Sequence, residues 1–184
     1  MQEISLNILD IAQNSIRANA TLIEIIIEEN PESDIFAFTI KDNGCGMDED
    51  MVKKVSDPFV TTRTTRKVGL GISLLKSAAQ QTGGGIKIES KPGEGTTIRA
   101  DFSHSHIDRQ PLGDISAVMI SLISMNPAID FVYTHRFMGS TFELDTRELR
   151  SVFGENVRLS EISVVTWIQK FLNNNLSEIY GGAK

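Results

Sequence analysis

The chain has 184 residues but only one cysteine and no long apolar run. Cys45 has no internal partner for a disulfide, which fits a reducing compartment and predicts a cytoplasmic protein. The longest apolar stretch, residues 117–125, is interrupted by Ser121 and Ser124 and is far shorter than the roughly 20 residues that a membrane span needs. The first residues carry neither a basic start nor an apolar run, so neither a secretory segment nor a membrane segment is expected.

Positive charge is also scarce, because 18 Lys and Arg stand against 24 Asp and Glu and give a net charge of −6. This balance argues against a nucleic-acid partner, although Arg63, Arg66 and Lys67 form a local basic cluster. Small ligands and protein partners fit the charge better. The chain also lacks a Gly-x-x-x-x-Gly-Lys-Ser/Thr segment, which excludes a Walker-type phosphate loop.

Hydrophobic periodicity divides the first 102 residues into alternating helices and strands. Helices are expected over 5–17, 48–55 and 70–81. Strands are expected over 22–28 and 35–41, followed by a hairpin that includes 86–88 and 98–102. Residues 57–68 have no clear period and are interpreted as a mobile loop.

A polar stretch at 103–111 follows the last of these strands and predicts a boundary between two domains, 1–102 and 112–184. The second part is expected to be a small α+β domain. Its predicted elements are a helix over 113–125, strands over 129–137 and 140–144, and helices over 145–153 and 160–172. Asp145 and Glu148 have the spacing of a capping box at the start of the first of these last two helices.

The segment Asp42-Asn43-Gly44-Cys45-Gly46-Met47 is the most informative motif in the chain. Asp42 can accept a hydrogen bond from the amino group of an adenine. Gly44 and Gly46 carry no side chain and leave room for the base, and Met47 supplies a flexible apolar wall. Taken alone, however, Asp-Asn-Gly is also a common hairpin turn.

Asp10 and Asn14 lie four residues apart and therefore project from one face of the first predicted helix. A carboxylate at this place can accept a proton from an attacking water or hydroxyl group. A neutral amide oxygen is a suitable ligand for Mg²⁺. Without further motifs, the simpler interpretation of the pair is an exposed Asp and Asn on a solvated helix face.

Two glycine motifs complete the set. Gly69-Leu70-Gly71 opens a helix, so its backbone N–H groups and the positive end of the helix could hold phosphate oxygens. Thr96 follows the tight turn Gly93-Glu94-Gly95. Each motif also has a simpler explanation, close packing for the first and an ordinary strand threonine for the second.

In this order the four motifs resemble the GHKL family of ATP-binding domains, which includes gyrase B, MutL, the large heat-shock chaperones, histidine kinases and anti-sigma-factor serine kinases. The resemblance covers roughly residues 1–102. It implies an α+β fold, a two-layer α/β sandwich of the Bergerat type with helices on one face of a mixed sheet, that binds ATP and Mg²⁺. It further implies that Asp10 is the general base, that Asn14 ligates Mg²⁺, and that Thr96 shares a water with the adenine-binding Asp42.

Residues 57–63, followed by 68–73, resemble the lid that closes over the phosphates in histidine kinases and anti-sigma-factor kinases. The resemblance makes the polar residues of this segment and the start of the next helix candidate phosphate contacts. These candidates are Thr61, Thr62, Arg63, Lys67, Gly69, Leu70 and Gly71. Individually, the side chains of the loop could also be no more than solvated.

A histidine kinase additionally needs a phosphoacceptor histidine, usually followed by an acid. Here His104 precedes Ser, His106 precedes Ile and His135 precedes Arg, so none matches and transfer would go to another chain. Hydroxyl and water acceptors need a base, so the acid at Asp10 favours a serine/threonine kinase of the anti-sigma type or a hydrolase.

Two functions stay open on this basis. The chain is expected to be a regulatory protein kinase that passes the γ-phosphate of ATP to a partner protein. Alternatively it is an ATP-operated switch that hydrolyses ATP slowly while its C-terminal part engages a partner. Residues 112–176 would be the docking module in both cases, or they would cover the exposed sheet or form an interface between copies of the chain.

Overall fold

The computed structural model describes residues 3–56, 70–154 and 157–181. Its strands are β1 (Leu22–Asn30), β2 (Ile35–Asp42), β3 (Gly85–Lys91), β4 (Gly95–Ser103), β5 (Asp130–Phe137) and β6 (Ser140–Asp145). Its helices are α1 (Ile4–Arg17), α2 (Glu49–Ser56), α3 (Leu70–Gln81), α4 (Ile115–Met125), α5 (Thr146–Phe153) and α6 (Ile162–Gly181).

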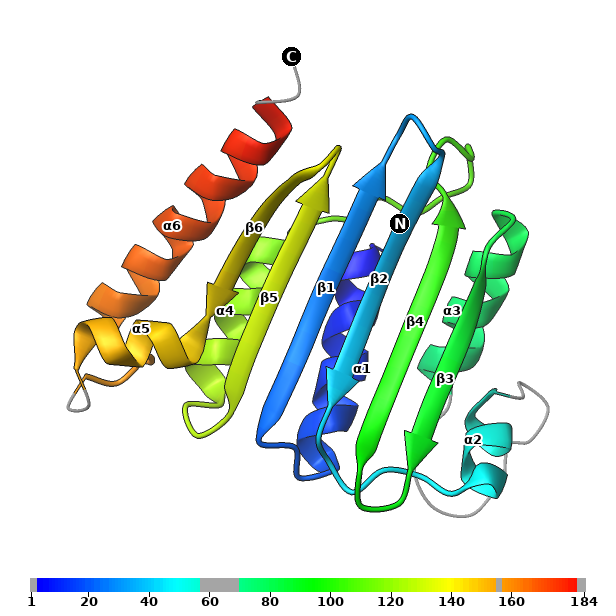
Figure 1. Ribbon diagram of the computed structural model, residues 1–184, viewed down its shortest axis with the longest axis horizontal. Coiled ribbons are helices and arrows are strands. Elements are labelled where there is room, and N and C mark those ends of the chain that lie inside the picture. The colour runs from blue at the N-terminus through cyan, green and yellow to red at the C-terminus, as the bar shows by residue number, and fades with distance from the viewer. Residues whose placement is uncertain (1–2, 57–69, 155–156, 182–184) are drawn as a thin grey trace.

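The elements form two layers (Figure 1). One layer is a six-stranded mixed sheet in the order β3-β4-β2-β1-β5-β6. Helices α1, α3 and α4 lie behind this sheet in the view of Figure 1, and α6 packs on α4 and on the β5–β6 pair. The other face of the sheet carries charged side chains, among them Arg99 and Glu28, whose Nη1 and Oε2 atoms lie 2.5 Å apart. The predicted two-layer α+β architecture is confirmed.

Helix α1 owes its place in the core to the spacing of its apolar residues. Its buried positions follow at intervals of three and four, from Ile4 through Ile8 and Ile11 to Ser15. The facing strand β1 alternates, so that Ile23, Ile25 and Ile27 point into the same core. Full burial of such a side chain contributes about 1.5–3 kcal/mol, so these two elements anchor the first half of the chain.

The C-terminal part continues this sheet, and the separate α+β domain expected after residue 111 is not seen. Strand β5 runs parallel to β1 and pairs with it from Leu22 opposite Asp130 to Glu29 opposite Phe137. Helix α4 packs on α1, and buried side chains from both parts of the chain form one hydrophobic core. The physical reason is that β1 has two edges, and its outer N–H and C=O groups need partners that only β5 supplies. The segment therefore covers an edge of the sheet that residues 1–102 begin.

Two details of the helices also differ from expectation. Helix α6 ends at Gly181 instead of residue 172, because Leu176 and Ile179 continue its buried stripe through a run of asparagines. At the start of α5, the Asp145 side chain accepts a hydrogen bond from the backbone N–H of Arg147 at 2.8 Å. Asp145 thus caps the helix, but through the N–H of Arg147 and not that of Glu148, which the predicted capping box would use. Within the described parts of the chain, no helix is long and apolar enough to cross a membrane.

Candidate nucleotide site

A row of three polar residues crosses the sheet at the end where β2 stops, and this end of β2 lies at the bottom in Figure 1. Asp42 is the last residue of β2, Thr96 lies directly opposite it on β4, and Ser90 lies opposite Thr96 on β3. Residues that pair directly across strands point to the same face of a sheet, which here is the face covered by helices. The register thus brings together two residues from motifs far apart in the sequence, Asp42 and Thr96, and adds Ser90.

The carboxylate of Asp42 is buried, with 9 % of the residue exposed, and already holds two hydrogen bonds. Its Oδ2 accepts from the hydroxyl of Ser15 at 2.5 Å, and its Oδ1 accepts from the backbone N–H of Gly44 at 2.9 Å. Because Ser15 gives its hydrogen to Asp42, the serine oxygen can only accept from any further group. Asp42 and Ser15 therefore present hydrogen-bond acceptors, as recognition of an adenine amino group requires.

Ser15 and Ser90 were missed in the sequence, yet each left a signal there. Ser15 is a polar residue on the mainly apolar buried stripe of α1. Ser90 follows Ile86 and Ile88 at the strand period of two, so it had to point to the same face as they do. In both cases, a polar side chain at a core position marked a residue that binds another polar group.

The two glycines of the Asp42 motif make room for the chain's own backbone. A Cβ on Gly44 would lie 2.8 Å from the carbonyl oxygen of Ala18, and one on Gly46 would lie 1.9 Å from that of Lys91. Gly46 also has φ +67°, a conformation that glycine adopts at little cost. The motif is thus packed between the end of α1 and the β3–β4 hairpin. From the sequence, the two glycines were expected to leave room for the base, and this close packing was not predicted.

Helix α1 and the start of α3 meet at Asp10. The carboxylate of Asp10 is exposed, and its Oδ2 would lie 3.8 Å from a Cβ placed on Gly71. Leu70 is the first residue of α3, so the acid lies near the positive end of that helix. One turn further along α1, the amide oxygen of Asn14 accepts a hydrogen bond from Nη1 of Arg17 at 3.1 Å. Asp10, Asn14 and Gly71 are thereby brought to one side of the site.

The remaining candidates divide into two groups. Met47 is half-buried beside the row, and its backbone N–H donates to the Oγ of Ser90 at 2.8 Å. The residues expected to contact phosphates from the lid, Thr61, Thr62, Arg63, Lys67 and Gly69, lie outside the described residues.

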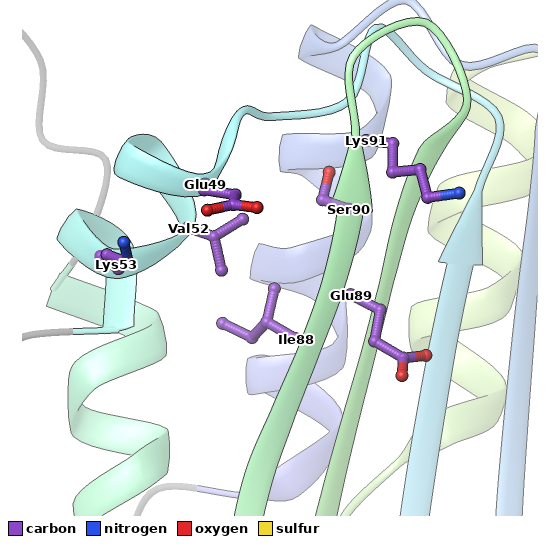
Figure 2. Close-up of a pocket in the computed structure, with 7 residues that line it drawn as sticks. All are labelled: Glu49, Val52, Lys53, Ile88, Glu89, Ser90 and Lys91. Carbon is purple, nitrogen blue, oxygen red and sulfur yellow. The ribbon is translucent and has the colours of Figure 1, made fainter.

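An open groove of about 520 Å³ runs between α2 and β3 next to the polar row. Figure 2 shows Glu49 and Val52 of α2 pointing towards β3, and Ile88 of β3 pointing towards α2. Ser90 lines both this groove and the polar row, so it lies between the two.

A second polar cluster lies at the opposite end of the sheet, where β1, β5 and α6 end. His135 is completely buried, with its Nδ1 2.6 Å from the hydroxyl of Tyr133 and its Nε2 2.9 Å from Oε1 of Glu29. The hydroxyl of Tyr180 on α6 also donates to Oε1 of Glu29. With both ring nitrogens engaged in the core, His135 is not placed to receive a phosphate from another molecule.

This cluster shifts the titration of its members. Burial opposes the charge of Glu29, but hydrogen bonds from His135 and Tyr180 outweigh it and hold the pKa of this carboxyl below its usual value. Burial raises the pKa of Tyr133, and burial together with the adjacent Glu29 raises that of Tyr180. Both tyrosines therefore stay neutral donors at physiological pH.

Comparison with known proteins agrees with this geometry. Residues 2–106 match the family described as histidine kinase-, DNA gyrase B- and HSP90-like ATPase. The match covers more than half of the chain, so the protein belongs to this family of ATP-binding domains, and the GHKL resemblance is confirmed.

Its curated relatives include sensor kinases. A putative sensor protein of Shewanella frigidimarina is 34% identical over 109 residues, covering 58% of this chain and 17% of the relative. The signal transduction histidine-protein kinase AtoS of Escherichia coli is 38% identical over 99 residues, covering 53% of this chain and 16% of the relative. The sensor kinase CckA of Brucella abortus is 40% identical over 70 residues, covering 38% and 7%. The chain thus spans less than a fifth of the length of these relatives.

A solved structure supports the fold over a longer range. The N-terminal domain of a DNA repair protein has a TM-score of 0.58 to this chain at 18% identity, covering 84% of this chain and 57% of that one. The covered share extends beyond the family match and so includes part of the C-terminal segment that continues the sheet.

Proposed function

We propose that this protein binds ATP with Mg²⁺ and transfers the γ-phosphate to a side chain of a partner protein. The observation that carries the proposal is that one helix, α1, links both ends of the site. Ser15 holds the acid expected to bind the base, whereas Asp10 lies at the start of α3, where phosphates are expected. At about 1.5 Å per residue, the two positions are about 7.5 Å apart along the helix, which separates a base end from a phosphate end.

The residues present fit a magnesium ion held through the nucleotide. Asn14 supplies one neutral oxygen, and Mg²⁺ commonly completes its shell with phosphate oxygens and waters. When bound, the ion would neutralise charge on the phosphates. Arg17 now donates to the Asn14 oxygen and would have to turn away for this role, which its exposed position allows.

A protein acceptor is favoured by the surface around Asp10. Leu6 lies one turn before Asp10 on α1, and Leu74 lies one turn after Gly71 on α3; 50 % and 57 % of these residues are exposed. Exposed apolar side chains on two helices beside an exposed carboxylate suit a protein that approaches with its acceptor side chain. Asp10 would accept the proton of a hydroxyl acceptor during transfer.

One observation favours the second candidate, an ATP-operated switch. Helix α4 of the C-terminal part packs directly on α1, which carries Asp10 and Asn14. A change in α1 on nucleotide binding or hydrolysis would therefore reach α4 and the α6 helix packed on it. In this case the C-terminal part would present the nucleotide state to a partner.

Incubation with γ-labelled ATP and a cell extract tests the two candidates. Label on a protein band supports the kinase, and label released only as free phosphate supports the switch. Resistance of the bound label to acid would show whether the acceptor is a hydroxyl or a histidine, because phosphohistidine is hydrolysed by acid. Absence of ATP binding in calorimetry would contradict both candidates.

Two variants and a matched control sharpen the experiment. Asp10→Asn should keep ATP affinity but lower turnover by about 100-fold or more, the usual contribution of a general base. Asn14→Ala should abolish magnesium-dependent ATP binding. Gln13→Ala removes an exposed amide from the same helix and should leave both quantities unchanged. Unchanged turnover in Asp10→Asn would remove this acid from the mechanism.

A further inference from the structure

Ser90 makes an unusual number of contacts for a single hydroxyl group. Its Oγ lies 2.8 Å from the backbone nitrogen of Met47, 2.9 Å from the carbonyl oxygen of Gly95 and 2.9 Å from Oγ1 of Thr96. It therefore joins the loop that follows Asp42 to the hairpin that carries Thr96. No family motif in the sequence pointed to this residue.

The hydrogens in this group can be assigned from what each atom is able to donate. A serine hydroxyl has one hydrogen and two lone pairs. The carbonyl of Gly95 can only accept, so it takes the hydrogen of Ser90, and the N–H of Met47 can only donate, so it takes one lone pair. The remaining lone pair of Ser90 accepts the hydrogen of Thr96. This assignment gives every donor an acceptor at 2.8–2.9 Å.

The assignment fixes what Thr96 can offer to a ligand. With its hydrogen directed at Ser90, Thr96 presents only lone pairs towards the rest of the row. Asp42, directly opposite on β2, is a carboxylate that also only accepts, and Ser15 has already given its hydrogen to Asp42. The polar row is thus an acceptor-only surface, and Ser90 is what keeps Thr96 in that state.

We propose that Ser90 is a positioning residue that sets the base selectivity of the nucleotide site. It acts by holding the Thr96 hydroxyl as an acceptor, directly or through a bound water. Adenine carries an amino group at position 6 and matches such a surface, whereas guanine carries an oxygen there and would face lone pairs. The proposal rests on the proposed function in one respect, that a purine nucleotide binds over this row.

Competition calorimetry with ATP and GTP tests the proposal on the full chain. In Ser90→Ala the Thr96 hydroxyl loses its acceptor and can rotate to donate to the guanine oxygen. The ratio of GTP to ATP dissociation constants should then fall about tenfold, as expected for one hydrogen bond of about 1–1.5 kcal/mol. Ser90→Thr keeps a hydroxyl at this position and should keep the wild-type ratio. Ser124→Ala removes a half-buried serine of α4 away from the site and should not change it.

The ratio of GTP to ATP dissociation constants separates a role of Ser90 in base selectivity from a purely structural role. A Ser90 that merely braced the loop would, when removed, weaken ATP and GTP equally, and an unchanged ratio would overturn the proposal. Thr96→Val gives an independent test, because it removes the acceptor that favours the adenine amino group without adding a donor for guanine; it should lower the ratio by less than Ser90→Ala does, with Thr97→Val on the opposite face as its control. A ratio unaffected by Thr96→Val would overturn the proposal even if Ser90→Ala did not fold.

The coupling of the two residues gives the last readout. If Ser90 acts through Thr96, adding Ser90→Ala to Thr96→Val should not change the ratio further. An additive change would assign Ser90 a separate effect and contradict the proposal. A wild-type chain that bound neither nucleotide would instead contradict the proposed function, so the two failures are distinguishable.

Discussion

The two ends of the sheet hold polar clusters of opposite character. Near the ends of β1 and β5, which lie at the top in Figure 1, the cluster of Glu29, Tyr133, His135 and Tyr180 pairs its members with one another. The Glu29 carboxylate can only accept, so Nε2 of His135 donates to it, while Nδ1 of His135 pairs with the Tyr133 hydroxyl; both ring nitrogens are thereby satisfied. At the lower end, the hydrogens of Ser15, Ser90 and Thr96 point inward and lone pairs remain towards the nucleotide site.

This difference shows how the same kind of residue serves two purposes. A closed cluster ties distant segments together, since the upper one joins the end of β1 to β5 and to the last turns of α6. An acceptor-rich cluster with outward lone pairs leaves part of its hydrogen-bonding capacity for a ligand. We therefore expect changes at the upper end to alter stability and changes at the lower end to alter nucleotide binding.

The largest expected effect comes from ending the chain at residue 111. This truncation removes His135 and Tyr180, leaves the edge of β1 without β5, and leaves α1 without α4. We expect the fragment to lose cooperative unfolding, because unpaired backbone and exposed core are both costly. Thermal unfolding followed by circular dichroism is the measurement. A fragment that melted cooperatively and bound ATP would show that the predicted division at 103–111 separates a self-sufficient domain.

Next in size is Glu29→Ala, which leaves the donors of His135 and Tyr180 without their shared acceptor. The free energy of unfolding should fall by about 3 kcal/mol, because the ring N–H of the fully buried His135 and the hydroxyl of the partly exposed Tyr180 lose their acceptor. The dissociation constant for ATP should stay the same. Urea unfolding and calorimetry measure the two quantities, and Glu32→Ala in the exposed β1–β2 turn is the control. A matching loss of ATP affinity would contradict the expectation that one polar cluster serves stability and the other nucleotide binding.

Asp42→Asn should show the reverse pattern. The amide replaces one acceptor oxygen by a donor, so ATP affinity should fall about 30-fold, or about 2 kcal/mol, as for a hydrogen bond to a charged group. The free energy of unfolding should change by less than about 1 kcal/mol, since the side chain keeps its shape. The exposed Asp108→Asn is the matched control. If stability fell more than affinity, the lower cluster would be structural as well.

The smallest expected effect is a decrease in the free energy of unfolding at acidic pH. The pKa of Glu29 is lowered in the folded state from an ordinary value of 4.5. Its contribution to stability is therefore present above about pH 4.5 and is lost as the pH falls through the lowered folded-state pKa. Unfolding free energies measured at several pH values between about 3 and 6 should decline towards acid less steeply in Glu29→Gln than in the wild type. Parallel profiles would show that Glu29 does not carry this dependence.

Local patterns allowed most of the elements to be predicted, and the reason differs from one to the next. Helix α1 and strand β1 were predictable because their apolar residues repeat at the periods of a helix and a strand. The length of α6 was not, because the asparagines at 173–175 weaken the local signal while Leu176 and Ile179 are buried by tertiary contacts.

The site follows the same division. Asp10, Asn14, Asp42 and Thr96 could be named as candidates because their residue types and spacing match motifs of the family that the sequence resembles. Ser15 and Ser90 could not be assigned a role, because their partners lie on other elements and become neighbours only through the register of the sheet and the packing of α1.

By itself, the sequence determined the family, the order of helices and strands and the candidate residues of the nucleotide site, all of which depend on local spacing, residue type and resemblance to known motifs. Only the tertiary structure decided that β5 joins β1 in one sheet, that one polar cluster is closed while the other keeps unshared lone pairs, and in which direction each hydroxyl donates. These features depend on pairing between segments far apart in the chain, where the partner of a backbone edge or of a hydroxyl hydrogen is set by geometry.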